Sequence, residues 1–168
     1  MDAEDRKEAE RVLRDLLLGA KIVGAHWLTT LVLVISRHMS APHWTRYGVA
    51  YDEMSLTLES RWTIFAAPPE HFPECEEDLP ELSLSERVAA IAGLAQEHST
   101  AVSLHEHHPH LILTFESGRI FFLNGRHEEF ESWTVQTRGG QHGDEWTIVA
   151  TPGSRIAVFD PKNTIRFD

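Results

Sequence analysis

The chain has 168 residues, of which 42% are hydrophobic and 24% are charged. This length and composition are typical of one folded domain and exclude a chain that is disordered over most of its length. The formal net charge of −11 disfavours nucleic-acid binding, because neutralising phosphates requires a basic patch. We therefore expect residues 1–168 to form a single acidic domain.

The N-terminal region predicts a helix and contains no secretory signal. Residues 3–18 repeat apolar side chains at helical spacing, Asp2 is a suitable N-cap, and Gly19 follows the last apolar position. The first ten residues are charged and lack the apolar core of a signal peptide. The longest apolar stretch, residues 28–35, is too short to span a bilayer. We expect a cytoplasmic protein without a membrane partner.

Strand patterns follow this helix. Residues 31–35 are apolar and β-branched, which predicts a strand buried on both faces. Residues 54–59 alternate between apolar and polar side chains, and residues 62–66 continue as a strand. Prolines and carboxylates then dominate residues 69–83, which predicts an exposed connection without regular structure.

The second half of the chain has a similar plan. Ser83 and Glu86 form a capping-box pattern at the start of a second helix, which extends to about Gln96 and has Val88, Ala89, Ala92 and Leu94 as apolar positions. Further strands are expected at residues 111–115, 120–123, 130–137, 145–150 and 155–159. Helices and antiparallel strands in this order predict an α+β fold.

Residues 3–68 and 84–160 are similar enough to suggest an internal duplication. Each half begins with a helix that contains Glu-Arg-Val, and the segment from Trp62 to Pro68 resembles the segment from Trp146 to Pro152. The tetrapeptide Glu59-Ser-Arg-Trp62 also resembles Glu131-Ser-Trp133, which gives a second possible alignment. We therefore predict two pseudo-repeated helix-plus-antiparallel-sheet units, packed as one domain and joined by the connection at 69–83. The alternative is that strands of similar composition match by chance.

The sequence offers few candidates for chemistry. No catalytic motif is present, no carboxylate spacing singles out an acid–base pair, and residues 128–131 are expected to face solvent. The single cysteine, Cys75, excludes a disulfide within the chain, and its acidic neighbours disfavour a thiolate. We expect no enzymatic activity and no cofactor.

A histidine cluster is the one candidate metal site. Imidazoles bind zinc, copper and nickel, but Pro109 and the flanking apolar runs indicate a hairpin tip, and the spacing differs from that of helical zinc proteases. A solvated polar loop is the preferred interpretation. The candidate ligands are His105, His107, His108 and His110.

Two segments have the residue types of a protein interface. One combines the aromatic and arginine side chains that are enriched at binding hot spots, and the other is an acidic run that would attract a basic partner. The candidate partner-binding residues are Trp44, Arg46, Tyr47, Glu74, Glu76, Glu77 and Asp78.

A family resemblance supports a binding role. The run Leu111-x-Leu-x-Phe115-x-x-Gly118, followed by Ile120-x-Phe-x-Asn-Gly125 and by Phe130-Glu-Ser-Trp133, resembles small uncharacterised bacterial domains. Some of these look like immunity proteins encoded beside secreted antibacterial toxins. The resemblance covers about residues 84–160 and implies a toxin inhibitor without catalytic residues. The net charge of −11 suits a basic toxin domain as its partner. The alternative is a metal- or small-molecule-binding β domain, including an enzyme of unrecognised type.

Overall fold

The computed structural model describes residues 1–27, 29–37, 53–138 and 145–161. These residues form two antiparallel sheets and two α-helices, which confirms the predicted α+β class. No helix in these ranges is long and apolar enough to cross a membrane. The elements in chain order are α1 (Ala3–Leu17), β1 (Lys21–Trp27), β2 (Leu31–Ser36), β3 (Glu53–Leu58), β4 (Trp62–Phe65), a 3-10 helix η1 (Glu76–Asp78), α2 (Leu84–Leu94), β5 (Ser99–Leu104), β6 (Leu111–Phe115), β7 (Ile120–Leu123), β8 (Trp133–Arg138), β9 (Thr147–Thr151) and β10 (Arg155–Phe159).

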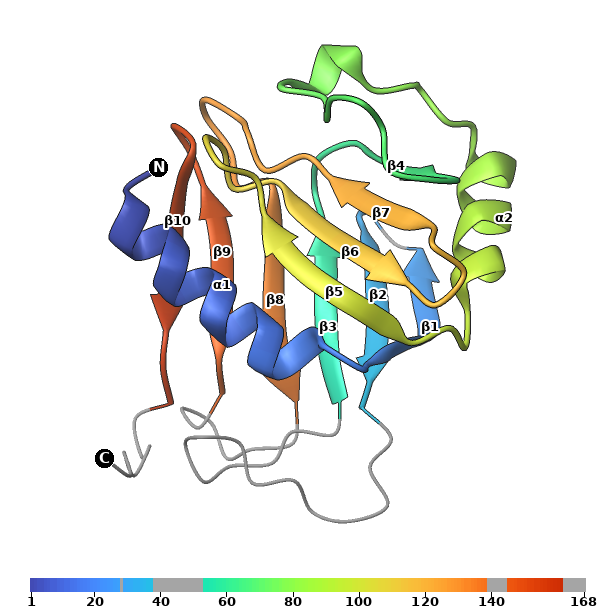
Figure 1. Cartoon of the computed structure of the whole chain (residues 1–168), viewed down its shortest axis with the longest axis horizontal. Helices are drawn as coiled ribbons and strands as arrows, with labels where there is room; N and C mark the ends of the chain where they lie inside the picture. Colours follow the sequence, from blue (N-terminus) through green and yellow to red (C-terminus); the bar gives the residue numbers. More distant parts are fainter. Residues whose placement is uncertain (28, 38–52, 139–144, 162–168) are drawn as a thin grey trace.

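The chain changes sheet twice. One sheet has six strands in the order β1-β2-β3-β8-β9-β10, and the other has four in the order β4-β7-β6-β5. Strands β1 to β3 form a meander in the first sheet, after which β4 crosses to the second. Strands β5 to β7 form a meander in the second sheet, and β8 then crosses back to pair with β3. Figure 1 shows the four-stranded sheet lying across the larger one.

This connectivity bears on the predicted duplication without establishing it. In each half a helix precedes a three-stranded meander, and the next strand crosses to the other sheet, where it pairs with the last meander strand of the other half. The crossing strands are β4 and β8, which begin at Trp62 and Trp133. The order of elements therefore favours the Glu59–Trp62 to Glu131–Trp133 alignment over the one with Trp146, and the duplication stays a prediction.

The main core lies between the sheets, where alternate side chains of both converge. Leu33, Leu56 and Val135 from the six-stranded sheet belong to the same buried cluster as Leu113 and Phe121 from the four-stranded sheet. Trp62, Trp133 and Trp146 are all buried. On β2, Val34 is buried but Val32 is only half-buried. The prediction that residues 31–35 are buried on both faces is therefore wrong at Val32, because the outer face of this sheet is only partly covered.

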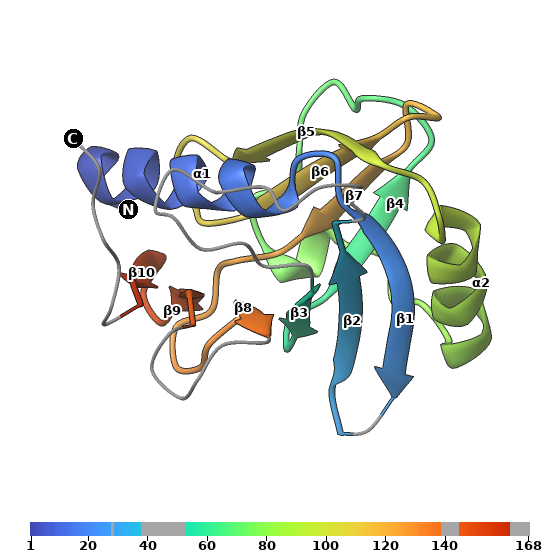
Figure 2. The same ribbon diagram turned by 90° about the horizontal axis from the view of Figure 1, so that it is seen from below.

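Helix α1 closes the side of the core that the smaller sheet leaves open. In Figure 2 both lie on the same side of the six-stranded sheet, with α1 over the end that contains β10. The helix also satisfies backbone groups of strand β5 at the sheet edge: Arg14 Nε donates to the Val102 carbonyl (2.9 Å), and the Leu104 amide donates to the Glu10 carboxylate (3.4 Å). Edge strands with free amides and carbonyls invite pairing with other chains, and α1 removes part of that risk.

The acidic connection is more ordered than the sequence predicts. Residues 76–78 form a 3-10 helix, and Leu79 is buried against the outer face of the four-stranded sheet together with Ile112, Ile120 and Phe122. The ring of Phe72 stacks on that of Phe122 at a centroid distance of 5.6 Å. The expected lack of regular structure is wrong because Leu79 is buried, and Phe72 partly buried, against the outer face of this sheet.

Helix α2 ends earlier and packs less than predicted. It stops at Leu94, and Gln96 takes a positive φ of 74°. The capping box of Ser83 and Glu86 is present, but of the four predicted apolar positions only Leu94 is buried, with Ile91 beside it in the core.

Strand β1 was not predicted, because Gly24 and His26 interrupt its apolar pattern.

The difference between the two helices predicts how they respond to the same substitution. Leu13 of α1 is fully buried, whereas Leu84 of α2 is 63% exposed. We expect Leu13→Ala to lower the free energy of unfolding by about 2–5 kcal/mol and Leu84→Ala to change it by less than about 0.5 kcal/mol. Urea unfolding of both variants measures the difference, and equal losses would contradict the burial described here.

Candidate functional site

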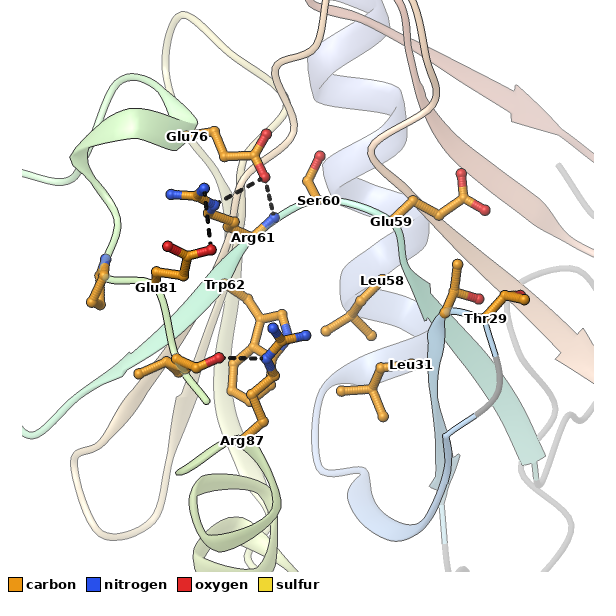
Figure 3. Close-up of a pocket in the computed structure, with 13 residues that line it drawn as sticks. Thr29, Leu31, Leu58, Glu59, Ser60, Arg61, Trp62, Glu76, Glu81 and Arg87 are labelled. Carbon is orange, nitrogen blue, oxygen red and sulfur yellow. Dashed lines mark hydrogen bonds and ion pairs between the residues drawn. The ribbon is translucent and has the colours of Figure 1, made fainter. Parts of the chain in front are cut away.

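The acidic segment is anchored to the body of the protein through Glu76. Its carboxylate accepts a hydrogen bond from the Arg61 backbone amide (3.0 Å) and lies 3.7 Å from Arg61 Nε, while Arg61 Nη2 lies 4.0 Å from Glu81. Figure 3 shows both carboxylates beside this guanidinium. Arg61 immediately precedes β4, so the ion pairs fix the segment to the start of that strand.

A hollow of about 220 Å³ lies on one side of Glu76. Its base is apolar, formed by Leu31, Leu58 and the buried ring of Trp62. Arg87 of α2 also lines the hollow and donates from Nε to the Leu82 carbonyl (2.9 Å; Figure 3). The polar lining mixes two arginines with three carboxylates and several hydroxyls. It consists of Thr29, Thr30, Glu59, Ser60, Arg61, Glu76, Glu81 and Arg87.

A larger, open hollow of about 500 Å³ is also lined by Glu76. It separates the acidic segment from the loop between β7 and β8, and four carboxylates face it with a single arginine, Arg126. We call this surface the acidic face. It is formed by Glu76, Glu77, Glu128 and Glu129, with Glu74 and Asp78 adjacent to Glu76 and Glu77 in the chain.

The β7–β8 loop also presents an exposed aromatic ring beside the acidic face. Phe130 is 64% exposed, and its ring centroid lies 5.0 Å from that of His127. His127 Nδ1 accepts hydrogen bonds from the backbone amides of Glu129 (3.1 Å) and Phe130 (3.0 Å). These bonds hold residues 127–130 in a tight turn, so the phenyl ring is presented on an ordered loop.

Cys75 lines the same hollow but is a poor nucleophile. Its Sγ lies 3.2 Å from the Asp78 carboxylate, and hydrogen bonds to Asp78 and Glu77 raise the pKa of the thiol above its usual value. A raised pKa lowers the thiolate fraction at neutral pH, in agreement with the acidic neighbours seen in the sequence. The hydrogen bond with Cys75 and one from its own backbone lower the pKa of Glu77.

The histidine cluster lies at the expected hairpin tip, between β5 and β6. The expectation of a solvated loop is wrong for His110, which is fully buried, and for His105 and His108, which are half-buried. In the described part of the chain, no three histidine, cysteine or carboxylate side chains are arranged to hold a metal ion. The metal-site alternative therefore has no geometric support in these residues.

The predicted binding residues are only partly placed by the structure. Trp44, Arg46 and Tyr47 lie outside the described residues. Glu74, Glu77 and Asp78 are exposed as expected, whereas Glu76 is half-buried and bound to Arg61.

Sequence reasoning gave Glu128, Glu129 and Phe130 no role beyond facing solvent, and Phe130 was placed in a strand. The signal that could have found them is the tripeptide itself, an aromatic residue directly after two carboxylates and close to the Asn-Gly turn at Asn124.

Comparison of the chain with models of known protein families, with curated proteins and with solved structures found no match in any of the three.

The contact between Cys75 and Asp78 can be tested directly, since the chain has one cysteine. We expect Asp78→Asn to lower the thiol pKa and to raise the rate of alkylation by iodoacetamide severalfold at about pH 8. Glu70→Gln, a nearby exposed carboxylate, is the control and should leave the rate unchanged. An unchanged rate in Asp78→Asn would show that this hydrogen bond does not govern the thiol.

Proposed function

We propose that this protein is a non-catalytic binding module, most specifically an immunity protein that neutralises a basic toxin by direct contact. The observation that carries the proposal is the acidic face, where carboxylates from two distant chain segments meet across an open hollow next to the exposed ring of Phe130. The resemblance of residues 84–160 to immunity-like domains points to the same class of function.

The charge of the acidic face suits a basic partner. Arg126 lies 3.8 Å from Glu128 and Arg61 pairs with Glu76, so the four carboxylates of the hollow still leave a negative balance that adds to the net charge of −11. Such complementarity accelerates encounter and selects against acidic partners, while it contributes less to the lifetime of a complex. Glu74, Glu77 and Asp78 are solvated, so each contributes to the field without a large desolvation cost.

Phe130 supplies the apolar contact area that the charges of the acidic face do not provide. A partner that covers this ring removes apolar surface from water, which is the main source of affinity at the centre of protein interfaces. Its loop is held by His127 Nδ1, so little conformational entropy is lost when a partner binds. An ordered aromatic ring flanked by carboxylates is the arrangement expected of an anchor with a polar rim.

The direct test is the product of the gene beside the one that encodes this chain. We expect that product to be toxic when expressed alone, to be harmless when co-expressed with this protein, and to co-purify with it. A harmless product, or one that stays toxic in the presence of this protein, would refute the immunity function.

With that toxin as the probe, binding kinetics should separate the two contributions. We expect Phe130→Ala to raise the dissociation rate about tenfold or more. We expect Glu128→Gln combined with Glu129→Gln to lower the association rate severalfold at low salt and to have little effect at high salt. Surface plasmon resonance at two ionic strengths measures both rates.

Matched controls are available on other elements. Phe159 of β10 is 59% exposed, so Phe159→Ala removes a similar ring from a different surface and should leave both rates unchanged. Glu4→Gln with Glu8→Gln removes the same charge from α1. If Phe130→Ala behaves like Phe159→Ala, the toxin does not bind at the acidic face.

The 220 Å³ hollow favours a second candidate function, the binding of a small anion. Within the described residues, no carboxylate lies within ion-pair distance of Arg87, and hydroxyls of Thr29, Thr30 and Ser60 surround the same space. However, the hollow is smaller than the ~300–1,000 Å³ of typical ligand sites, and three carboxylates oppose an anion there. A rise in melting temperature with millimolar phosphate or citrate that is lost in Arg87→Gln would support this function over the first.

A further inference from the structure

Four imidazoles are packed together at the tip of the β5–β6 hairpin. The ring of His110 lies 5.4 Å from that of His105 and 5.2 Å from that of His108, and the rings of His105 and His108 are stacked at 6.2 Å. His107 lies 5.9 Å from His105. On its other side His110 contacts Phe122 at 5.2 Å. The cluster is therefore continuous with the apolar packing on the outer face of the smaller sheet.

The same loop joins three other segments at this end of the molecule. His110 Nδ1 accepts a hydrogen bond from the Gly125 amide in the β7–β8 loop (2.8 Å), and His108 Nδ1 lies 3.1 Å from Ser154 Oγ in the β9–β10 turn. Trp133 Nε1 at the start of β8 donates to the Pro109 carbonyl (2.8 Å). Gly125 packs so closely that a Cβ there would lie 1.9 Å from that carbonyl oxygen.

The hydrogen bond between the Gly125 amide and His110 requires an uncharged His110 ring. Because Nδ1 accepts the Gly125 amide, the ring proton is on Nε2, which is buried. A second proton on Nδ1 would replace the acceptor with a donor that faces another donor. It would also place a full charge in a buried site, which costs several kcal/mol unless the charge is paired.

The charges around the cluster do not offset that cost. Positive charge comes from Arg6 of α1, Arg126 of the β7–β8 loop and the N-terminal ammonium, and negative charge from Glu74 and Glu106. Burial lowers the pKa of His110 to about 3, and a hydrogen bond with the Glu74 backbone raises this pKa by a smaller amount. Burial also lowers the pKa of His105 and of His108.

We propose that the four-histidine cluster is an acid-sensitive latch. In neutral medium it holds the β7–β8 loop against the β5–β6 hairpin, and protonation of its imidazoles in mildly acidic medium releases that loop. The released loop carries Glu128, Glu129 and Phe130, so the latch controls the geometry of the acidic face. That consequence rests on the proposed function, whereas the opening itself is a property of the isolated protein.

The direction and the steepness of the pH dependence follow from the linkage between proton binding and loop opening. A histidine whose pKa is lowered in the closed state binds its proton more readily in the open state, where the pKa returns toward about 6.5. Closure is therefore fully stable above about pH 6.5 and is weakened as the pH falls toward the closed-state value of about 3. For His110 alone the opening constant rises about tenfold per pH unit in this window, and His105 and His108 make the dependence steeper.

Amide hydrogen exchange of the isolated protein, followed by NMR between about pH 7.5 and pH 5.5, tests the latch. We expect the protection factor of the Gly125 amide, corrected for its intrinsic exchange rate, to fall at least tenfold over this range. The amide of Val135, within β8, is expected to keep its protection. Local opening is thereby distinguished from unfolding of the whole domain.

Two variants sharpen the test. His110→Asn places an amide oxygen near the position of Nδ1, where it can accept from the Gly125 amide but does not titrate. The fall in Gly125 protection with decreasing pH should therefore become shallower by about tenfold per pH unit. His71→Asn, an exposed histidine outside the cluster, should behave like the wild type. If His110→Asn does not fold, the imidazole proton shifts of the wild type give the same information, because His110 should stay uncharged until Gly125 loses protection.

Three results would overturn the latch. One is constant protection of Gly125 down to about pH 5.5, the second is loss of protection at Gly125 and Val135 together, and the third is titration of His110 with an ordinary pKa while the loop stays closed. None of these depends on a partner, so they leave the immunity proposal standing. Conversely, a harmless neighbouring gene product would leave the latch intact.

Discussion

The structure depends on one constraint, which is that two antiparallel sheets must bury their facing sides against each other when they differ in width. Four strands cannot cover six, and α1 fills the remaining space over the end that contains β10. Leu13, Leu16 and Leu17 of the helix join the same core as Phe121 of the smaller sheet. Because α1 also bonds the β5 edge through Arg14 and Glu10, it closes the core and protects that edge at once.

The smaller sheet then needs cover for its outer face, and this requirement orders the acidic segment. Phe72 and Leu79 supply apolar cover over Ile112, Ile120 and Phe122. Carboxylates between these two anchors must point away from the sheet, since burying unpaired charge is costly. The acidic face is thus a by-product of how the sheet is covered, with Glu76 retained as the exception because Arg61 pairs with it.

The local pattern was sufficient to predict α1, the capping box of α2, most strands and the α+β class. It failed where tertiary contacts decide the outcome. Strand β1 exists because β2 offers an edge to pair with despite Gly24 and His26, and Val88 is exposed although the spacing of α2 predicted it to be apolar and buried. At the site, the acidic residues near Glu77 were visible in the sequence. Their meeting with Glu128 and Glu129 was not, because it depends on how β7 pairs with β4 and on the loop after β7.

Burial changes what the histidine-rich segment can do. The sequence suggests a ligand set or a solvated loop, but His110 accepts the Gly125 amide and packs on Phe122, so its one available nitrogen is already used. A buried imidazole that serves as a hydrogen-bond acceptor cannot also ligate a metal through that atom, and Nε2 carries the proton. The contact between His110 and the β7–β8 loop therefore requires that the His110 ring be uncharged. Proton uptake and loop opening are then two descriptions of one equilibrium, and any change that stabilises the closed loop must lower the apparent proton affinity of His110.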